Sequence, residues 1–142
     1  MNEPSLCHLK IPLRLAVETP RGLLIVPLWF EARGASLWCA SQAESRLVRA
    51  LRAAPRCAFD LSTNDMPYRG LRGRGRVICH PELGAQTLQA LLLRYFGTTD
   101  TPLARRLLRR AASEVALEVV PEWQSQWDFT QRMKSSLPPG TV

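Results

Sequence analysis

Short strand-like segments separated by tight turns occupy most of the first 80 residues, and this spacing constrains the fold more than any other feature. Apolar and polar residues alternate from Leu13 to Glu18, as in a strand with one buried face. Residues 23–30 are apolar throughout, which predicts a strand covered on both faces. Proline and glycine residues mark the turns on either side of that segment. The spacing predicts a meander of hairpins.

Four further strands are predicted, at residues 36–40, 57–61, 68–80 and 115–119. In the strand 68–80 one face is arginine and the other is apolar or glycine. Arg72, Arg74 and Arg76 form the first face and have no assigned partner. A glycine within a strand often marks a bend or the close approach of a ligand or another backbone. Gly73 and Gly75 are therefore candidate positions for such a bend or close approach.

Three helices are predicted between the strands. The first begins at Ser41, with Glu44 completing a capping box, and ends before Pro55. The second ends at Gly97, and Thr101 caps the third. The outward face of the third helix carries a cluster of charge that is interpreted as solvated surface: Arg105, Arg106, Arg109 and Arg110. The predicted class is α+β, a six-stranded antiparallel split β-barrel with three inserted helices.

Length and composition predict one domain over residues 1–142, with a short N-terminal arm (1–12) and a C-terminal tail (129–142). The net charge is +7, and 17 of the 19 cationic residues are arginine, which favours an anionic partner such as a phosphorylated cofactor, nucleic acid or acidic lipid. The four cysteines have no zinc-ligand spacing, so no metal is expected. Cys39, Cys57 and Cys79 lie in apolar, strand-like segments that suit a buried role. Neither a signal peptide nor a membrane span is evident, and a cytoplasmic protein is expected.

Two segments contain candidate binding residues. Pro27 interrupts an apolar strand, where it suits an edge or a bulge, and Trp29 beside it is suited to packing on a planar ligand or in the core. The helix that begins near Ser41 offers a positive dipole end, the Ser45 hydroxyl and the charges of Arg46 and Arg49. A phosphate site and an ordinary capped surface helix both fit this second segment. No nucleophile has a recognisable partner, so the catalytic residues are unknown and a cofactor would have to supply any reaction.

Taken in order, these segments resemble the FMN-binding split β-barrel family, the pyridoxamine 5′-phosphate oxidase-like proteins. The resemblance runs from about Leu13 to Asp128. Residues 22–30 (G-L-L-I-V-P-L-W-F) resemble a family strand, G-x-P-x-x-x-P-x-W-F, with Leu24 in place of its first proline. The other matching segments are residues 36–41, Ser45-Arg46-Leu47 at the place of a family S-R-K phosphate motif, residues 55–59, Tyr68-Arg69-Gly70 with Gly73 and Gly75, and Trp127-Asp128.

The resemblance implies a homodimer with FMN at the subunit interface and a small-molecule substrate; neither nucleic acid nor a membrane is an expected partner. Val26, Pro27, Leu28 and Trp29 would lie along the ring system. The ribityl phosphate would be held by Ser41, Ser45 and Arg46, and Trp127 would cover the site. The implied activity is that of an FMN-dependent oxidoreductase.

One departure from the family pattern bears on the cofactor. Leu47 stands where the family has its phosphate lysine, so Arg49 or Arg69 is the hypothesised substitute. The chain also lacks the family's C-terminal substrate segment, which argues against pyridoxamine phosphate oxidation itself. Deazaflavin and haem, which replace FMN in some relatives, stay open as cofactors. Two alternatives of another kind are a basic module that binds nucleic acid and a split-barrel dimer without a cofactor.

Overall fold

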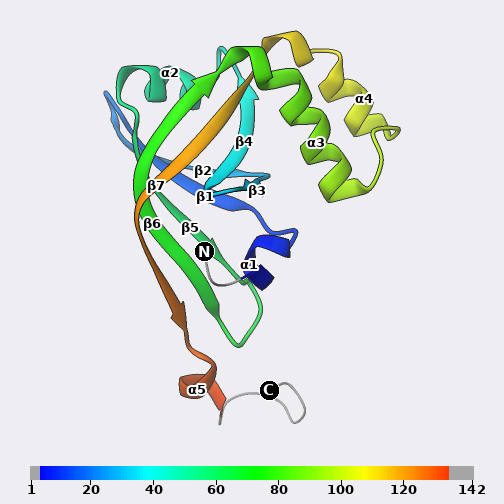
Figure 1. The fold of residues 1–142 in the computed structure, drawn as a ribbon. Coiled ribbons are helices and arrows are strands. Elements are labelled where there is room, and N and C mark those ends of the chain that lie inside the picture. The colour runs from blue at the N-terminus through cyan, green and yellow to red at the C-terminus, as the bar shows by residue number, and fades with distance from the viewer. Residues whose placement is uncertain (1–3, 135–142) are drawn as a thin grey trace.

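The computed structural model describes residues 4–134, in which seven antiparallel strands form one strongly bent sheet. The spatial order is β2-β1-β5-β6-β7-β4-β3. Figure 1 shows β6 and β7 running the length of the molecule, with α2 beside one end and α5 at the other. The strands are β1 (Leu13–Thr19), β2 (Gly22–Leu28), β3 (Glu31–Arg33), β4 (Ser36–Gln42), β5 (Arg56–Ser62), β6 (Arg69–His80) and β7 (Glu114–Asp128).

The prediction of six strands was wrong by one, and the sheet is not closed into a barrel. The additional strand is β3, which pairs with β4 through Glu31, Ala32 and Arg33. Sequence analysis assigned these residues to a turn, because a strand of three residues is too short to show an alternating pattern. The turn itself lies at Gly34, whose φ of 58° is the left-handed conformation that glycine adopts readily.

The last strand is also longer than predicted. Sequence analysis ended this strand at residue 119, whereas β7 continues to Asp128 and pairs with β6 as far as Arg69. A bulge between Arg74 and Gly75 shifts the register there. A bulge inserts one extra residue and inverts the alternation after it, so the continuation of the strand was hidden in the sequence. A Cβ atom on Gly75 would overlap the backbone of Val120, which confirms the predicted close approach of another backbone.

The three predicted helices are present, and two short ones lie outside them. The helices are α1 (Pro4–His8), α2 (Arg46–Ala53), α3 (Gly84–Phe96), α4 (Pro102–Leu108) and α5 (Thr130–Met133), with 3₁₀ turns at Pro81–Leu83 and Ala111–Ser113. Gly97 ends α3 with a φ of 73°, and the Thr101 hydroxyl caps α4, both as predicted. The predicted capping box was wrong. Ser45 is the N-cap of α2, while Ser41 belongs to β4.

The main core cluster packs the sheet against α2 and also contains Leu6 of α1. Leu47 and Val48 of α2 are 3% and 0% exposed within it. A smaller apolar cluster joins α3 and α4 to Trp29 and Ala40. The prediction that the segment 23–30 is covered on both faces does not hold within one chain. Leu23 is 82% exposed and Ile25 is 66% exposed on β2.

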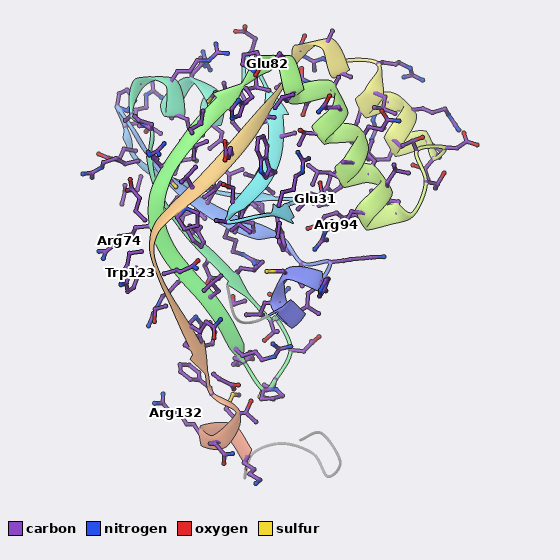
Figure 2. The ribbon with its side chains drawn as sticks, in the orientation of Figure 1. Glu31, Arg74, Glu82, Arg94, Trp123 and Arg132 are labelled. Carbon is purple, nitrogen blue, oxygen red and sulfur yellow. The ribbon has the colours of Figure 1, made fainter. Side chains whose placement is uncertain are left out.

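The N-terminal arm is tied to α3 by side-chain hydrogen bonds. Arg94 donates to the carbonyl oxygens of Cys7 (2.6 Å) and Leu9 (3.1 Å). The Tyr95 hydroxyl donates to the carbonyl of Ile11 (2.9 Å) and accepts from the backbone N–H of Phe30 (3.1 Å). Figure 2 shows Arg94 on the side of the sheet where α1 and α3 lie. Within residues 4–134, no helix has the length and apolar character needed to cross a bilayer.

Candidate functional site

The start of α2 brings two predicted phosphate residues into contact. Ser41, near the end of β4, donates a hydrogen bond from its hydroxyl to the Ser45 hydroxyl oxygen at 2.9 Å. The same Ser45 oxygen accepts from the backbone N–H of Val48 at 3.1 Å. A hydroxyl has two acceptor lone pairs and one proton. Because both lone pairs of Ser45 are used, its own proton is free to be donated to an anion.

The charges around this turn also suit an anion. Arg46 and Arg49 are exposed on the first turn of α2, which contains no acidic residue. Glu44 precedes the N-cap instead of lying inside the helix, so it does not reach back to the helix start as the capping-box interpretation required. Leu47 is buried in the core, so its side chain supplies no positive charge to the turn. The cation that the family lysine supplies would therefore come from the exposed arginines.

Arg69 and Trp127 lie together elsewhere, at the opposite end of β6 and β7. They line a small cavity of about 150 Å³, together with Leu6, Gln126 and Asp128. The Trp127 ring lies against Gly70, where a Cβ atom would be 2.6 Å from the indole, and contacts Phe129 with a centroid distance of 4.9 Å. Gly70 is therefore a place of close approach within the sheet.

The two groups of predicted site residues do not meet within one chain. Ser41 pairs with Val115 of β7, whereas Arg69 pairs with Asp128 at the other end of that strand. Val115 and Trp127 are twelve residues apart, which corresponds to at most about 40 Å of extended strand. The two groups of one protomer therefore lie toward opposite ends of β7.

The third predicted group, residues 26–29, lies at the edge of the sheet. Pro27 is in β2, whose only partner in the sheet described here is β1, so the prediction of an edge position is confirmed. Pro27 is exposed, whereas Val26 and Leu28 are half-buried. Trp29 is held by α3, with ring centroids 5.6 Å from Tyr95 and 5.4 Å from Phe96.

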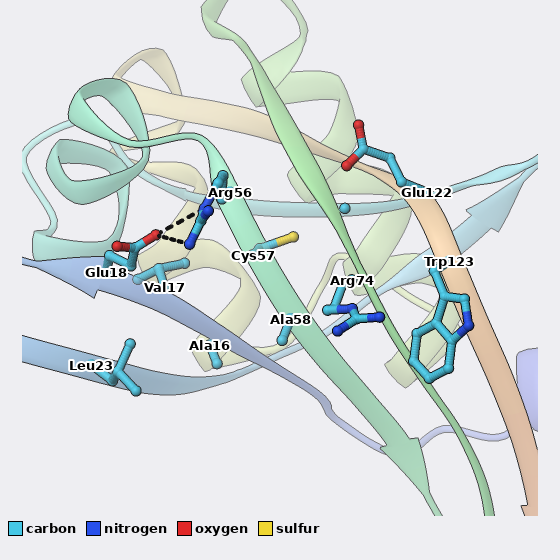
Figure 3. A pocket seen from close by; sticks show the side chains of 11 residues that line it. Ala16, Val17, Glu18, Leu23, Arg56, Cys57, Ala58, Arg74, Glu122 and Trp123 are labelled. Carbon is cyan, nitrogen blue, oxygen red and sulfur yellow. Dashed lines mark hydrogen bonds and ion pairs between the residues drawn. The ribbon is translucent and has the colours of Figure 1, made fainter.

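A wider groove of about 540 Å³, which sequence analysis missed, crosses the outer face of β1, β5, β6 and β7 (Figure 3). Ala16, Ala58 and Gly75 leave the space, because their side chains are small or absent. Arg74 lies over the Trp123 ring at 4.6 Å from its centroid, on the side of the sheet away from α3 and α4 (Figure 2). The alternation of arginine with apolar residues and glycine in β6 predicted the face on which the Arg74 side chain lies. Trp123 was hidden by the bulge that shifts the register of β7.

The arginines on this outer face have neighbours that offset their charge. Arg56 forms an ion pair with Glu18 at 3.0 Å, and Arg76 with Glu122 at 3.6 Å. The predicted outward direction of Arg72, Arg74 and Arg76 is confirmed. A face composed of such pairs differs from the continuous positive stripe that tracks a nucleic acid backbone.

Two cysteines are core residues. Cys39 and Cys57 are buried, as predicted, whereas Cys79 is only half-buried. Desolvation raises the pKa of Cys39, Cys57 and Cys79, and that of Cys57 lies at about 11. These thiols stay protonated at neutral pH, which makes them poor nucleophiles. Among residues 4–134, no group of three His, Cys, Asp or Glu side chains is arranged to hold a metal ion.

A polar cluster on the outer side links β4, β6 and β7. Glu118 accepts from the His80 ring at 3.0 Å and from the Ser36 hydroxyl at 2.8 Å. The His80 ring also stacks on Trp38, with centroids 5.2 Å apart. The hydrogen bond from His80, then the one from Ser36, lowers the pKa of Glu118. This cluster stabilises the ionised carboxylate and offers no nucleophile.

The lowered pKa of Glu118 predicts a contribution to stability that depends on pH. A carboxyl group whose pKa is lower in the folded state stabilises the fold above its unfolded pKa, near 4.3, and that contribution is lost as the pH falls. We expect Glu118→Gln to cost less than about 1 kcal/mol at pH 7 and close to nothing at pH 3. Urea unfolding at both pH values measures the difference. An equal cost at pH 3 and pH 7 would contradict this role.

The comparisons with known proteins place this geometry in a fold family. No protein-family model and no curated protein sequence matches the chain. An F420 reductase superposes with a TM-score of 0.74 and 27% identity, covering 88% of this chain and 97% of that protein. A putative pyridoxamine 5′-phosphate oxidase from Listeria innocua gives 0.66 and 14%, covering 87% and 93%. The haem storage protein HutZ from Vibrio cholerae gives 0.67 and 14%, covering 88% and 90%.

These neighbours confirm the family resemblance seen in the sequence motifs. The chain has the split-barrel fold of the pyridoxamine 5′-phosphate oxidase-like proteins. It is similar to the F420 reductase over nearly the whole length of both chains.

Proposed function

We propose that this chain binds FMN and is an oxidoreductase that transfers hydride or electrons to or from a small substrate. The observation that carries the proposal is the start of α2, where Ser45 has a hydroxyl proton available for an anion. Two exposed arginines, Arg46 and Arg49, lie in the first helical turn, which contains no acidic residue. A helix start with these groups suits a phosphate. Bound flavin supplies the redox chemistry, and the protein supplies binding and orientation. Cys39, Cys57 and Cys79 form no disulfide, which suits the reducing cytoplasm, where we place this activity.

Two other cofactors are alternatives to FMN at this site. The structural neighbours include an F420 reductase and a haem storage protein, so a deazaflavin and haem are the alternatives. Each combines a planar ring with anionic groups that Arg46 and Arg49 can bind. Of the three, FMN best suits a small site with two serine hydroxyls, because its single phosphate needs few partners.

We further propose that the functional unit is a homodimer. The groups around Ser45 and Trp127 are separated by most of the length of β7, so a cofactor that contacts both needs one group from each protomer. The exposed side chains of Leu23 and Ile25 offer an apolar surface at the sheet edge that a partner would cover. A twofold axis would place Trp127 of one copy over the phosphate turn of the other.

The dimer is tested by charging its proposed apolar surface. Burying a leucine or isoleucine contributes about 1.5–3 kcal/mol, so Leu23→Lys with Ile25→Lys should weaken association more than tenfold. Sedimentation velocity over a range of protein concentrations measures this. Leu93→Lys is the matched control, because Leu93 is also exposed (48%) but lies on α3. A double variant that dimerises like the parent protein would refute the interface.

Titration of the purified protein with FMN tests the proposed function. Flavin fluorescence should be quenched on binding, with one FMN per chain at saturation, and parallel titrations with F420 and haem rank the alternatives. Failure to bind any of the three would support the dimer without a cofactor. An affinity for oligonucleotides that falls steeply with salt would instead support the basic module.

A further inference from the structure

Glu114 is a buried carboxyl group beside the turn that leads into α2. Its residue is 8% exposed, at the start of β7, in register with Gln42 of β4. The Gln42 side-chain amide donates to the Glu114 carboxylate and to the carbonyl oxygen of Arg110, the latter at 3.2 Å. Glu114 is therefore hydrogen-bonded to Gln42, the residue that follows Ser41 in the chain.

Backbone hydrogen bonds also fix the turn from Gln42 to Ser45. The N–H of Ala43 donates to the carbonyl of Ser113 at 2.8 Å, and the N–H of Ser45 donates to the carbonyl of Gln42 at 3.0 Å. The position of the Ser45 hydroxyl thus depends on how Gln42 and Ala43 are held against residues 113–114. Because side chains alternate along a strand, Gln42 and Glu114 lie on the opposite face of the sheet from Ser41.

One polar atom of this arrangement lacks a partner. The Gln42 amide oxygen is buried and accepts no hydrogen bond among the described residues. A protonated carboxyl group can donate to an amide oxygen, whereas an ionised one cannot. The Gln42–Glu114 pair can therefore make two hydrogen bonds when Glu114 is protonated and one when it is ionised.

The burial of Glu114 disfavours its charged form. Desolvation raises its pKa, against the opposing effects of the Gln42 hydrogen bond and the charge of Arg110. The other charged side chains of this region, Glu44 and Arg46, are exposed on the turn. From α3, the backbone of Gly84 lies against the backbone of Glu114 and brings no charge.

We infer that Glu114 is a positioning residue for the phosphate site, and that its protonated form holds Gln42 and the turn in the arrangement that binds an anion. Ionisation of Glu114 removes a hydrogen bond to Gln42 and adds a negative charge behind the turn. Both changes weaken an anion bound at Ser45. The inference rests on the proposed function, because it assumes that the phosphate lies there.

The pH dependence of FMN affinity tests this inference. Glu114→Gln retains a donor and an acceptor for Gln42 and carries no charge at any pH. The FMN affinity of the unmodified protein, taken relative to that of Glu114→Gln, should fall on the order of fivefold from pH 5 to pH 8. Taking this ratio cancels the ionisation of FMN itself. Glu114→Ala, which loses the contact, should bind FMN less tightly than Glu114→Gln throughout. A ratio that stays constant with pH would overturn the inference.

A second measurement separates this inference from the proposed function. An acid whose pKa is raised in the folded state stabilises the fold below its unfolded pKa, and that contribution is lost as the pH rises through the folded pKa. The melting temperature of the cofactor-free protein, relative to Glu114→Gln, should therefore fall from pH 4 to pH 8. If FMN fails to bind at every pH, the proposed function is wrong. The melting temperatures still decide whether the pair exists, and parallel curves for the two proteins would refute it.

Discussion

Replacing Arg46 and Arg49 together by alanine is expected to weaken FMN binding by about 100-fold. Both guanidinium groups are exposed on the first turn of α2, beside the Ser45 hydroxyl. A hydrogen bond to a charged group contributes about 1.5–3 kcal/mol, so two of them acting on one phosphate account for this loss. Fluorescence titration of the double variant against the unmodified protein measures it.

A matched control separates contact with the phosphate from the general effect of charge. Arg106→Ala with Arg109→Ala removes the same two charges from the exposed face at α4. This control should change FMN affinity less than about twofold in 0.15 M salt, where charges more than about 8 Å away are screened. Equal losses in the two double variants would mean that net charge, and not the turn before α2, attracts the cofactor.

Gly84→Ala is expected to destabilise the protein by at least about 3 kcal/mol. The first residue of α3 lies directly against the backbone of β7, and a Cβ atom at Gly84 would overlap the carbonyl oxygen of Glu114. Backbone atoms cannot move aside as a flexible side chain can, so α3 would have to shift away from the sheet. Overpacking of this kind commonly costs about 1–3 kcal/mol, and a backbone overlap belongs at or above the upper end. Urea unfolding measures the change.

Gly97→Ala is the control for this substitution. Gly97 ends the same helix with a positive φ, and no atom lies within 4 Å of a Cβ placed there. The only expected cost is that of the left-handed conformation, about 1–2 kcal/mol. A Gly84→Ala variant as stable as Gly97→Ala would show that the junction between α3 and β7 is looser than the structure indicates.

The features that sequence analysis predicted well are those set by local chemistry. The two faces of β6 followed from its alternation, and the ends of α3 and α4 followed from Gly97, Thr101 and Pro102. The start of α2 did not follow, because Ser41 and Ser45 both resemble N-caps. Pairing of Ser41 with Val115 extends β4 and leaves Ser45 to begin the helix. Which serine caps the helix is therefore decided by pairing between distant segments, and the local pattern does not contain this information.

The candidate site depended even more on distant contacts. Sequence analysis named Ser45, Arg46 and Trp127 as one site, but their separation along β7 appears only when the register of β4 and β6 against β7 is known. Trp123 was missed because the bulge at Arg74 and Gly75 breaks the alternation on which strand prediction relies. The role inferred for Glu114 depends on the opposite strand, where Gln42 meets it.

The comparison of FMN with riboflavin tests the central claim most directly. Riboflavin has the same ring system and lacks the phosphate, so the ratio of the two affinities isolates the contribution of the phosphate site. We expect FMN to bind about 100-fold more tightly than riboflavin to the unmodified protein, and within about threefold of riboflavin to the Arg46→Ala, Arg49→Ala variant. Equal affinities of the unmodified protein for FMN and riboflavin would contradict a phosphate site at the start of α2.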